Sequence, residues 1–305
     1  MARAIKPIEE RRLLGIGLVL FGFFCFSVID SCAKWLSLSG LPSTEVVFVR
    51  YAGQFLLVMA LFAPSRGREL VTTRRPWLEI IRGLCLLGST ICNFVAITYI
   101  PLTVTASISF AMPLVLCALS VPVLGEKVGW RRWLAIVVGF IGVLIIVRPG
   151  TEAFHPVVLL SLLGVVFAAF YFLLTRKLAG VDASTTQQFY TAFTATLCIA
   201  PFAFSGWVWP TDTPTWIAFV VIGVAALVGH QAITTAHRFA PASVLAPFNY
   251  SLIVYLTTSS WLVFNQPPDI WIFVGAPFVI GSGLYIWLRE RQLARQVVTE
   301  MAAQD

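Results

Sequence analysis

Apolar stretches of about 20 residues recur along nearly the whole chain, and this recurrence constrains the fold more than any other feature. A helix of about 20 residues is long enough to cross the hydrocarbon core of a bilayer. The stretches occupy residues 13–36, 43–62, 77–99, 102–123, 130–147, 157–175, 186–204, 214–236, 242–264 and 270–288. None of the segments between them is long enough for a soluble domain. The pattern predicts an all-α integral membrane protein with ten transmembrane helices.

Composition excludes a water-soluble fold. Apolar residues make up 58% of the chain and charged residues 11%, whereas a soluble domain is about half apolar and about a quarter charged. The net charge of +7 does not indicate nucleic-acid binding, because the basic residues occur in short runs between apolar stretches. We expect membrane lipid and a small-molecule substrate as partners, no nucleic acid, no cofactor, and a protein that acts as a monomer.

The basic residues also predict the topology. Seventeen of the 21 Lys and Arg residues fall in alternate connecting segments and the two tails, while Lys34 and Arg148 lie near the opposite helix ends. Cytoplasmic segments of membrane proteins are enriched in Lys and Arg. We therefore expect a multi-pass protein of the cell (inner) membrane with cytoplasmic tails at residues 1–12 and 289–305. Two termini on one side also require an even number of spans.

The two halves of the chain are weakly repeated. A shift of 140 positions places residues 100–104 on residues 240–244, Gly83 on Gly223, and Phe110 on Tyr250. Five helices per half force the second half into the opposite orientation. The repeat predicts two five-helix units, residues 13–148 and 157–288, inverted around a central cavity, and such a cavity holds the solute in many secondary transporters.

Several motifs of the first half are distinctive. They are Arg82-Gly83-Leu84, residues 96–102, residues 106–114, Leu124-Gly125-Glu126-Lys127 and residues 133–143. Together they resemble the EamA-type domain of the drug/metabolite transporter superfamily, which occurs twice in ten-helix members. The second half resembles this domain more loosely, because Gln266 and two prolines replace the Gly-Glu turn.

The resemblance implies a secondary transporter that works by alternating access, and it extends to exporters of amino acids, the aromatic amino-acid exporter group among them. The alternative within the superfamily is an importer of a vitamin- or nucleoside-like solute, of the riboflavin or S-adenosylmethionine type. A membrane-embedded enzyme is the rival from another class. The chain is not expected to be an enzyme, because it lacks a GxSxG, HExxH or Walker-type motif.

Charged residues inside the spans are candidates for function, because a charge in a bilayer is costly. Asp30 and Lys34 are spaced i, i+4 on the first span, and Arg50 lies at a similar depth in the second. Two interpretations of Asp30 and Arg50 remain open. They form a structural ion pair, or Arg50 binds a substrate carboxylate while Asp30 orients it and takes part in proton coupling. Glu79 and Arg82, spaced i, i+3, are expected to form a local pair at the membrane interface.

Uncharged polar and aromatic residues within the spans are the other cavity candidates, because an amino acid needs hydrogen-bond partners for its ends and an apolar wall for its side chain. The candidates are Asn93, Tyr99, Thr105, Ser109, Phe110, Gln187, Tyr190, His230, Asn249 and Tyr250. Each also has a structural interpretation, since such residues often bond to backbone or pack helices together.

Two prolines inside spans, Pro113 and Pro247, are predicted to kink the fourth and ninth helices and to act as hinges. No metal site is predicted. His230 and His237 are seven residues apart without a third ligand, and the six cysteines fall in apolar stretches, as packing residues do.

Overall fold

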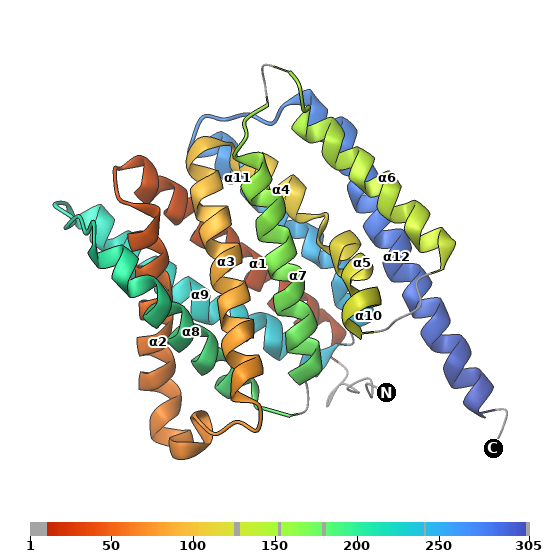
Figure 1. The fold of residues 1–305 in the computed structure, drawn as a ribbon, viewed down its shortest axis with the longest axis horizontal. Helices are drawn as coiled ribbons and strands as arrows, with labels where there is room; N and C mark the ends of the chain where they lie inside the picture. The colour runs from red at the N-terminus through yellow and green to blue at the C-terminus, as the bar shows by residue number, and fades with distance from the viewer. Residues whose placement is uncertain (1–10, 125–128, 152–153, 179–180, 241, 303–305) are drawn as a thin grey trace.

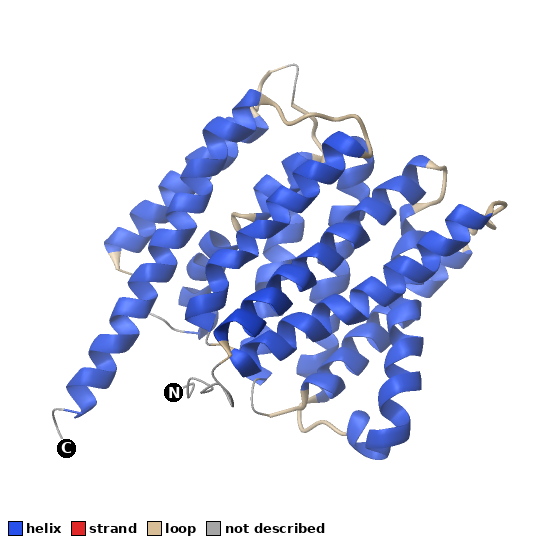
Figure 2. Ribbon diagram, turned by 180° about the vertical axis from the view of Figure 1, so that it is seen from behind, coloured by secondary structure: helices blue, strands red, loops and turns tan. Residues whose placement is uncertain are grey.

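The computed structural model describes residues 11–124, 129–151, 154–178, 181–240 and 242–302. Within these ranges the secondary structure is helical, with no strand, and the helices form one bundle (Figure 1, Figure 2). The elements are α1 (Arg12–Leu38), α2 (Ser43–Arg66), η1 (Gly67–Leu70), α3 (Pro76–Tyr99), α4 (Leu102–Ser109), α5 (Met112–Leu124), α6 (Trp130–Val147), α7 (Val158–Leu178), α8 (Ser184–Phe204), α9 (Thr213–Phe239), α10 (Ala242–Leu245), η2 (Ala246–Tyr250), α11 (Ser251–Leu262) and α12 (Ile270–Ala302).

Each predicted apolar stretch is helical. Within the described residues, eight segments have the length and hydropathy of a membrane span. The other two spans are α8, which is rich in Thr and Gln, and the segment formed by α10, η2 and α11. The prediction of an all-α integral membrane protein with ten transmembrane helices is therefore confirmed.

The fourth and ninth spans are interrupted. In the fourth, α4 ends at Ser109 and α5 begins at Met112, with Phe110 and Ala111 in a turn. In the ninth, the 3₁₀ helix η2 separates α10 from α11. Pro113 lies just after the first break and Pro247 within the second, as expected for residues that lack a backbone N–H donor. The structure thus has full interruptions where the sequence predicts kinks, and hinge motion at these prolines stays a prediction.

The packing of the helices follows an inverted two-fold exchange of the two halves. The counterpart of α1 in the other half is α7, and the counterpart of α3 is α9. Helix α1 packs on α9, and the equivalent contact in the other half is that of α7 with α3. Helix α2 packs on α8, and α6 packs on α12, so each of these four helices contacts its own counterpart. The halves therefore interlock, which confirms the predicted inverted repeats.

The two ends of the bundle differ in charge. Helix α1 begins and α12 ends at the same end, the lower one in Figure 1, where the α2–α3 and α7–α8 connections also lie. We call this the basic end, because it carries the exposed side chains of Arg66, Arg68, Arg74, Arg75 and Lys177. The opposite end, which holds the α1–α2, α3–α4 and α11–α12 connections, is called the far end.

Some predicted features fall outside the described residues. They are residues 125–127 of the Gly-Glu turn motif, Pro241 of the internal repeat, and the first ten residues of the N-terminal tail.

Glycine allows two pairs of helices to approach closely. A Cβ atom added to Gly142 in α6 would lie 2.8 Å from the carbonyl oxygen of Gly275 in α12, and one added to Gly275 would lie 2.6 Å from the carbonyl oxygen of Gly142. A Cβ added to Gly53 in α2 would lie 3.1 Å from the Cα of Gly223 in α9. These helix pairs are therefore in backbone-to-backbone contact, as small residues permit in membrane proteins.

We expect Gly142→Ala to destabilise the protein by about 1–3 kcal/mol, because the new methyl group overpacks the α6–α12 contact. Gly281→Ala in α12 is the matched control, since a Cβ there meets nothing within 4 Å. The measurement is the thermal unfolding midpoint of the detergent-solubilised protein. Equal midpoints for the two variants would contradict the packing argument.

Candidate functional site

A cavity of about 540 Å³ lies between the two halves, at the level of the two helix breaks. Its wall includes residues of α1, α2, α3, α7, α9 and α12 and the interrupted segments of the fourth and ninth spans. The residues singled out by sequence that line it are Asp30, Arg50, Asn93, Ser109, Phe110, His230, Asn249 and Tyr250. The volume is within the usual range for small-molecule sites, about 300–1,000 Å³.

Four other candidates do not line this cavity. The Tyr99 ring is exposed and stacks on His155 at the far end, with ring centroids 5.6 Å apart. Thr105 is buried and donates its hydroxyl to the Leu102 carbonyl at 2.9 Å.

The remaining two of these four, Gln187 and Tyr190, make contacts near the basic end. The Gln187 carbonyl accepts a hydrogen bond from Arg82, and the Tyr190 hydroxyl donates to the Val71 carbonyl at 2.8 Å. All four residues have the chemistry expected of cavity residues, but their contacts place them elsewhere in the bundle.

One part of the cavity wall is charged. Asp30 of α1 accepts a hydrogen bond from the Asn93 side-chain amide of α3, with the Oδ1 and Nδ2 atoms 3.0 Å apart. Asp30 is also attracted electrostatically to Arg50 of α2. Asn93 therefore holds the carboxylate in place, while the guanidinium adds charge to the same region.

Arg50 is buried, with a relative exposure of 6%, yet much of its hydrogen-bonding capacity is unused. Its Nε and Nη1 atoms are buried and have no hydrogen-bond partner among the described residues. Its Cζ atom lies 4.3 Å from the centre of the Tyr51 ring, and the Tyr51 hydroxyl is in turn 2.7 Å from Thr90 Oγ1. A buried donor without a partner is costly, and Arg50 therefore has unused hydrogen-bonding capacity at the border of the cavity.

Aromatic side chains line much of the rest of the cavity. Phe110 and Tyr250, at equivalent positions of the two helix breaks, form an edge-to-face pair with centroids 5.0 Å apart. The rings of Phe26 and His230 are 4.8 Å apart on another part of the wall. The cavity thus combines a few charged and amide groups with an apolar, aromatic surface.

The sequence did not single out Tyr171 and Phe172 of α7 or Trp287 of α12, although all three line the cavity. Aromatic residues occur on both the lipid-facing and the inward-facing sides of membrane helices. No local pattern therefore distinguishes these three from the exposed Trp209 or Phe273.

Lys34 joins the two halves of the chain at the far end. Its buried Nζ atom donates to the Ile100 carbonyl at 2.9 Å and to Gln266 Oε1 at 2.8 Å. The first acceptor follows α3, and the second lies in the α11–α12 connection of the other half. Asp30 and Lys34 are spaced i, i+4 but have different partners, because Lys34 lies one helical turn closer to the connections. We call this set of contacts the far-end latch.

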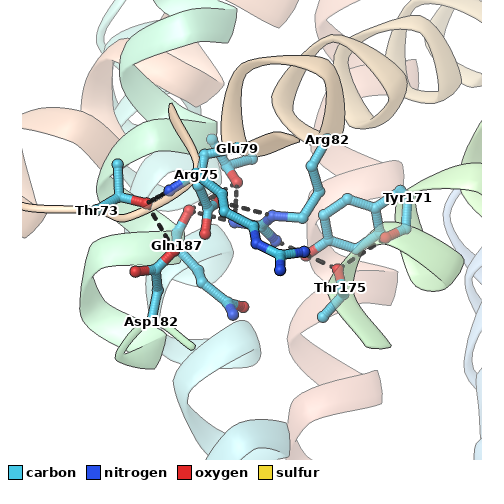
Figure 3. Close-up of polar contacts among 9 residues, drawn as sticks. Thr73, Arg75, Glu79, Arg82, Tyr171, Thr175, Asp182 and Gln187 are labelled. Atoms are coloured by element: carbon cyan, nitrogen blue, oxygen red, sulfur yellow. Dashed lines mark hydrogen bonds and ion pairs between the residues drawn. The ribbon is translucent and has the colours of Figure 1, made fainter. Parts of the chain in front are cut away.

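A second polar network lies toward the basic end, centred on Arg82 (Figure 3). The predicted pair is present, since Arg82 Nε donates to Glu79 Oε2 at 3.0 Å, and both side chains are buried within the protein. Arg82 also donates to the Gln187 carbonyl, to Thr191 Oγ1 at 2.8 Å and to Thr175 Oγ1 at 3.4 Å. It therefore joins α3 of the first half to α7 and α8 of the second.

The Arg82 network borders the cavity. The Arg82 Cζ atom lies 5.1 Å from the centre of the Tyr171 ring, and Tyr171 lines the cavity. Nearby, Thr73 donates to Asp182 Oδ2 at 2.7 Å, and Thr186 donates to the Glu69 carbonyl at 3.2 Å. These bonds connect the α2–α3 segment to the α7–α8 connection and to the start of α8 at the basic end.

Comparison with known proteins adds the following. The family model described as "EamA-like transporter family" matches residues 13–148 and 155–288. A solved crystal structure of 19% identity covers 91% of this chain and 98% of its own, with a TM-score of 0.60. At that identity the likeness shows a shared fold.

Three curated relatives cover most of the chain. The S-adenosylmethionine uptake transporter of Rickettsia prowazekii is 28% identical over 92% of this chain and 94% of its own. The riboflavin transporter of Vibrio cholerae is 28% identical over 95% of this chain and 98% of its own. The pseudopaline exporter of Pseudomonas aeruginosa is 29% identical over 87% of this chain and 93% of its own. Their names concern these solutes rather than aromatic amino acids, and they include both uptake and export.

We expect Lys34→Met to increase access to the cavity from the far end, because it removes both hydrogen bonds of the far-end latch. The test is the rate at which a membrane-impermeant thiol reagent labels a cysteine at Asn249, with the native cysteines replaced. Lys177→Met, at the exposed basic end, serves as the control. An unchanged labelling rate in Lys34→Met would show that the latch does not limit access.

Proposed function

Because this chain belongs to the EamA-like transporter family, we propose that it is a secondary transporter that carries a small metabolite across the cell membrane by alternating access. The chain is a membrane transporter by family, and the cavity between its inverted halves is the expected place for the solute. The two helix breaks at that cavity support the proposal. Irregular backbone at membrane depth is tolerated where it is buried in protein or lines a cavity.

The solute we propose carries a carboxylate next to an ammonium group, as an amino acid does. The observation that carries this proposal is the buried Arg50, whose Nε and Nη1 atoms lack partners. A guanidinium binds a carboxylate through two parallel hydrogen bonds. Asp30, held by Asn93 Nδ2 at 3.0 Å, supplies the negative charge for the ammonium group.

The apolar part of the solute lies against the aromatic wall. Phe110, Tyr250, Phe26 and Tyr171 offer ring faces and edges to a side chain, and such contacts favour other rings. Amino acids, aromatic ones included, fit this combination of a charged pole and an apolar wall, and we propose export as the direction.

A second candidate solute is favoured by the relatives. S-adenosylmethionine, named for the Rickettsia prowazekii relative, carries the same amino-carboxylate group together with a nucleoside. Arg50 and Asp30 can bind the amino-carboxylate group of S-adenosylmethionine in the same way, and the direction of transport would then be uptake. Riboflavin, named for the Vibrio cholerae relative, has no amino-carboxylate group and would use the aromatic wall alone.

We propose that the protein spans the cell (inner) membrane with its basic end, and therefore both termini, on the cytoplasmic side. The support is the exposed arginines of the α2–α3 segment, Arg66, Arg68, Arg74 and Arg75, because basic loops are retained on the cytoplasmic side. The far-end latch then faces the outside.

The function is tested with purified protein in liposomes. Labelled phenylalanine, leucine, S-adenosylmethionine and riboflavin are each measured in exchange against the same unlabelled solute inside, which requires no ion gradient. We expect exchange of at least one amino-carboxylate solute. Transport of riboflavin alone would contradict the proposed role of Arg50, and no exchange of any small metabolite would contradict transport.

We expect Arg50→Gln to weaken binding of the amino-carboxylate solute by about 1.5–3 kcal/mol, the contribution of a charged hydrogen bond. This loss corresponds to an increase in the exchange KM of about 10-fold or more. Arg50→Lys keeps the charge but not the two parallel bonds, so its KM should lie between that of the parent and that of Arg50→Gln. A KM for Arg50→Gln equal to that of the parent would place the carboxylate elsewhere.

A further inference from the structure

One carboxylate oxygen in the Arg82 network has no donor. Glu79 is buried with a relative exposure of 0%, and its Oε2 atom receives the Arg82 Nε–H at 3.0 Å. Its Oε1 atom is buried and lacks a hydrogen-bond partner among the described residues. A buried carboxylate usually has both oxygens satisfied, so this oxygen requires an explanation.

The group that faces this oxygen is a second carboxyl. Asp182, in the α7–α8 connection, is the acidic group next to the Glu79 carboxyl and acts on it electrostatically. Figure 3 shows the two carboxyl groups on the same side of the network, with Thr73 donating to Asp182. Two ionised carboxylates contain no donor, so a hydrogen bond between them requires one proton.

The charges of the surrounding elements lead to the same conclusion. On α3 the buried cation is Arg82, and the α2–α3 segment contributes Arg75, whose side chain is exposed. From α8, Tyr190 lies near both carboxyl groups, but its hydroxyl donates to the Val71 carbonyl, and from α7 Lys177 is exposed. One buried guanidinium thus faces two carboxyl groups, and one added proton makes this cluster neutral.

We propose that Glu79 and Asp182 together bind one proton, and that this proton holds the basic end of the cavity closed. With the proton, Glu79 Oε1 and Asp182 share a hydrogen bond that joins α3 to the α7–α8 connection. When the proton is lost to water at the basic end, two carboxylates remain and repel each other. The repulsion acts between the two halves of the chain, where the contacts of Arg82 and of the Thr73 hydroxyl also lie.

This proton site goes beyond the proposed solute site and differs from the coupling hypothesis for Asp30. Asp30 is held in the cavity by Asn93, whereas Glu79 and Asp182 lie beyond Tyr171 toward the basic end. Opening of the basic end would release the proton on the same side as the solute. The site therefore makes opening of the basic end depend on the pH on that side of the membrane.

The test measures access to the cavity and needs no solute, so it is independent of the proposed function. In a variant with the native cysteines replaced, Ser89→Cys places a thiol in the cavity wall, and Ser205→Cys places one on the exposed surface. Labelling with an impermeant maleimide is measured at about pH 6 and about pH 8, and the cavity rate is divided by the surface rate to remove the pH dependence of the thiol itself.

We expect the normalised labelling rate to rise about fivefold or more between about pH 6 and about pH 8, because loss of the proton shifts the population toward the open basic end. Glu79→Gln and Asp182→Asn supply an amide donor in place of the proton, so labelling should be slow at both pH values. Asp212→Asn, at the start of α9, is the matched control and should keep the pH dependence.

The proposal is overturned if the parent protein shows no pH dependence, or if both amide variants keep it. Should an amide variant fail to fold, infrared spectra of an Asp30→Asn variant decide instead, because this variant lacks the carboxyl group of the cavity wall. A protonated carboxyl band that is lost between about pH 6 and about pH 8 supports the site. The absence of such a band overturns it.

Discussion

The lack of water in the hydrocarbon core forces every backbone amide group of this chain to find its hydrogen-bond partner within the protein. Ten helical spans meet that requirement, and the two departures from it stand out. Phe110 and Ala111 form a turn, closed by a bond of 2.9 Å from the Ala111 N–H to the Ile108 carbonyl, and η2 replaces α-helix in the ninth span. Both departures border the cavity. The regular backbone hydrogen bonding of the helices is thus interrupted at the cavity, where a solute could bind to free backbone groups.

The same constraint orders the buried polar side chains into three levels. At the far end Lys34 is bonded to Ile100 and Gln266, and toward the basic end Arg82 is bonded to Glu79 and to α7 and α8. Between them lie Asp30, with its bond to Asn93, and Arg50, with two nitrogens left without a partner. Lys34 and Arg82 therefore have hydrogen-bond partners within the protein, whereas two nitrogens of Arg50 in the middle do not. For the alternating-access mechanism that we propose, these are the places where breakable contacts at the two ends and a site between them are needed.

The fold was largely predictable from the sequence, whereas only part of the site was. Span length and hydropathy are local properties, so the second span, predicted at 43–62, is α2 at Ser43–Arg66. Asp30, Arg50 and Asn93 were identifiable because polar groups are conspicuous inside a span, and Phe110 with Tyr250 because the repeat aligns them. The partners of Lys34 were not identifiable, because a backbone carbonyl and a glutamine from distant connections leave no local pattern. Tyr99 and Tyr190 have the right chemistry, but their contacts place them away from the cavity. Depth within the bilayer depends on tertiary packing.

Tyr171 belongs to two environments at once, since one part of its ring lines the cavity and the guanidinium of Arg82 lies 5.1 Å from its centre. Whatever occupies the cavity therefore alters the surroundings of the residue that ties α3 to α7 and α8. Thermodynamic linkage makes such an influence reciprocal: a ligand that favours one arrangement of the Arg82 contacts must bind more tightly to that arrangement, by the same factor. The affinity measured from one face of the membrane then need not equal the affinity measured from the other, even though a single chamber serves both.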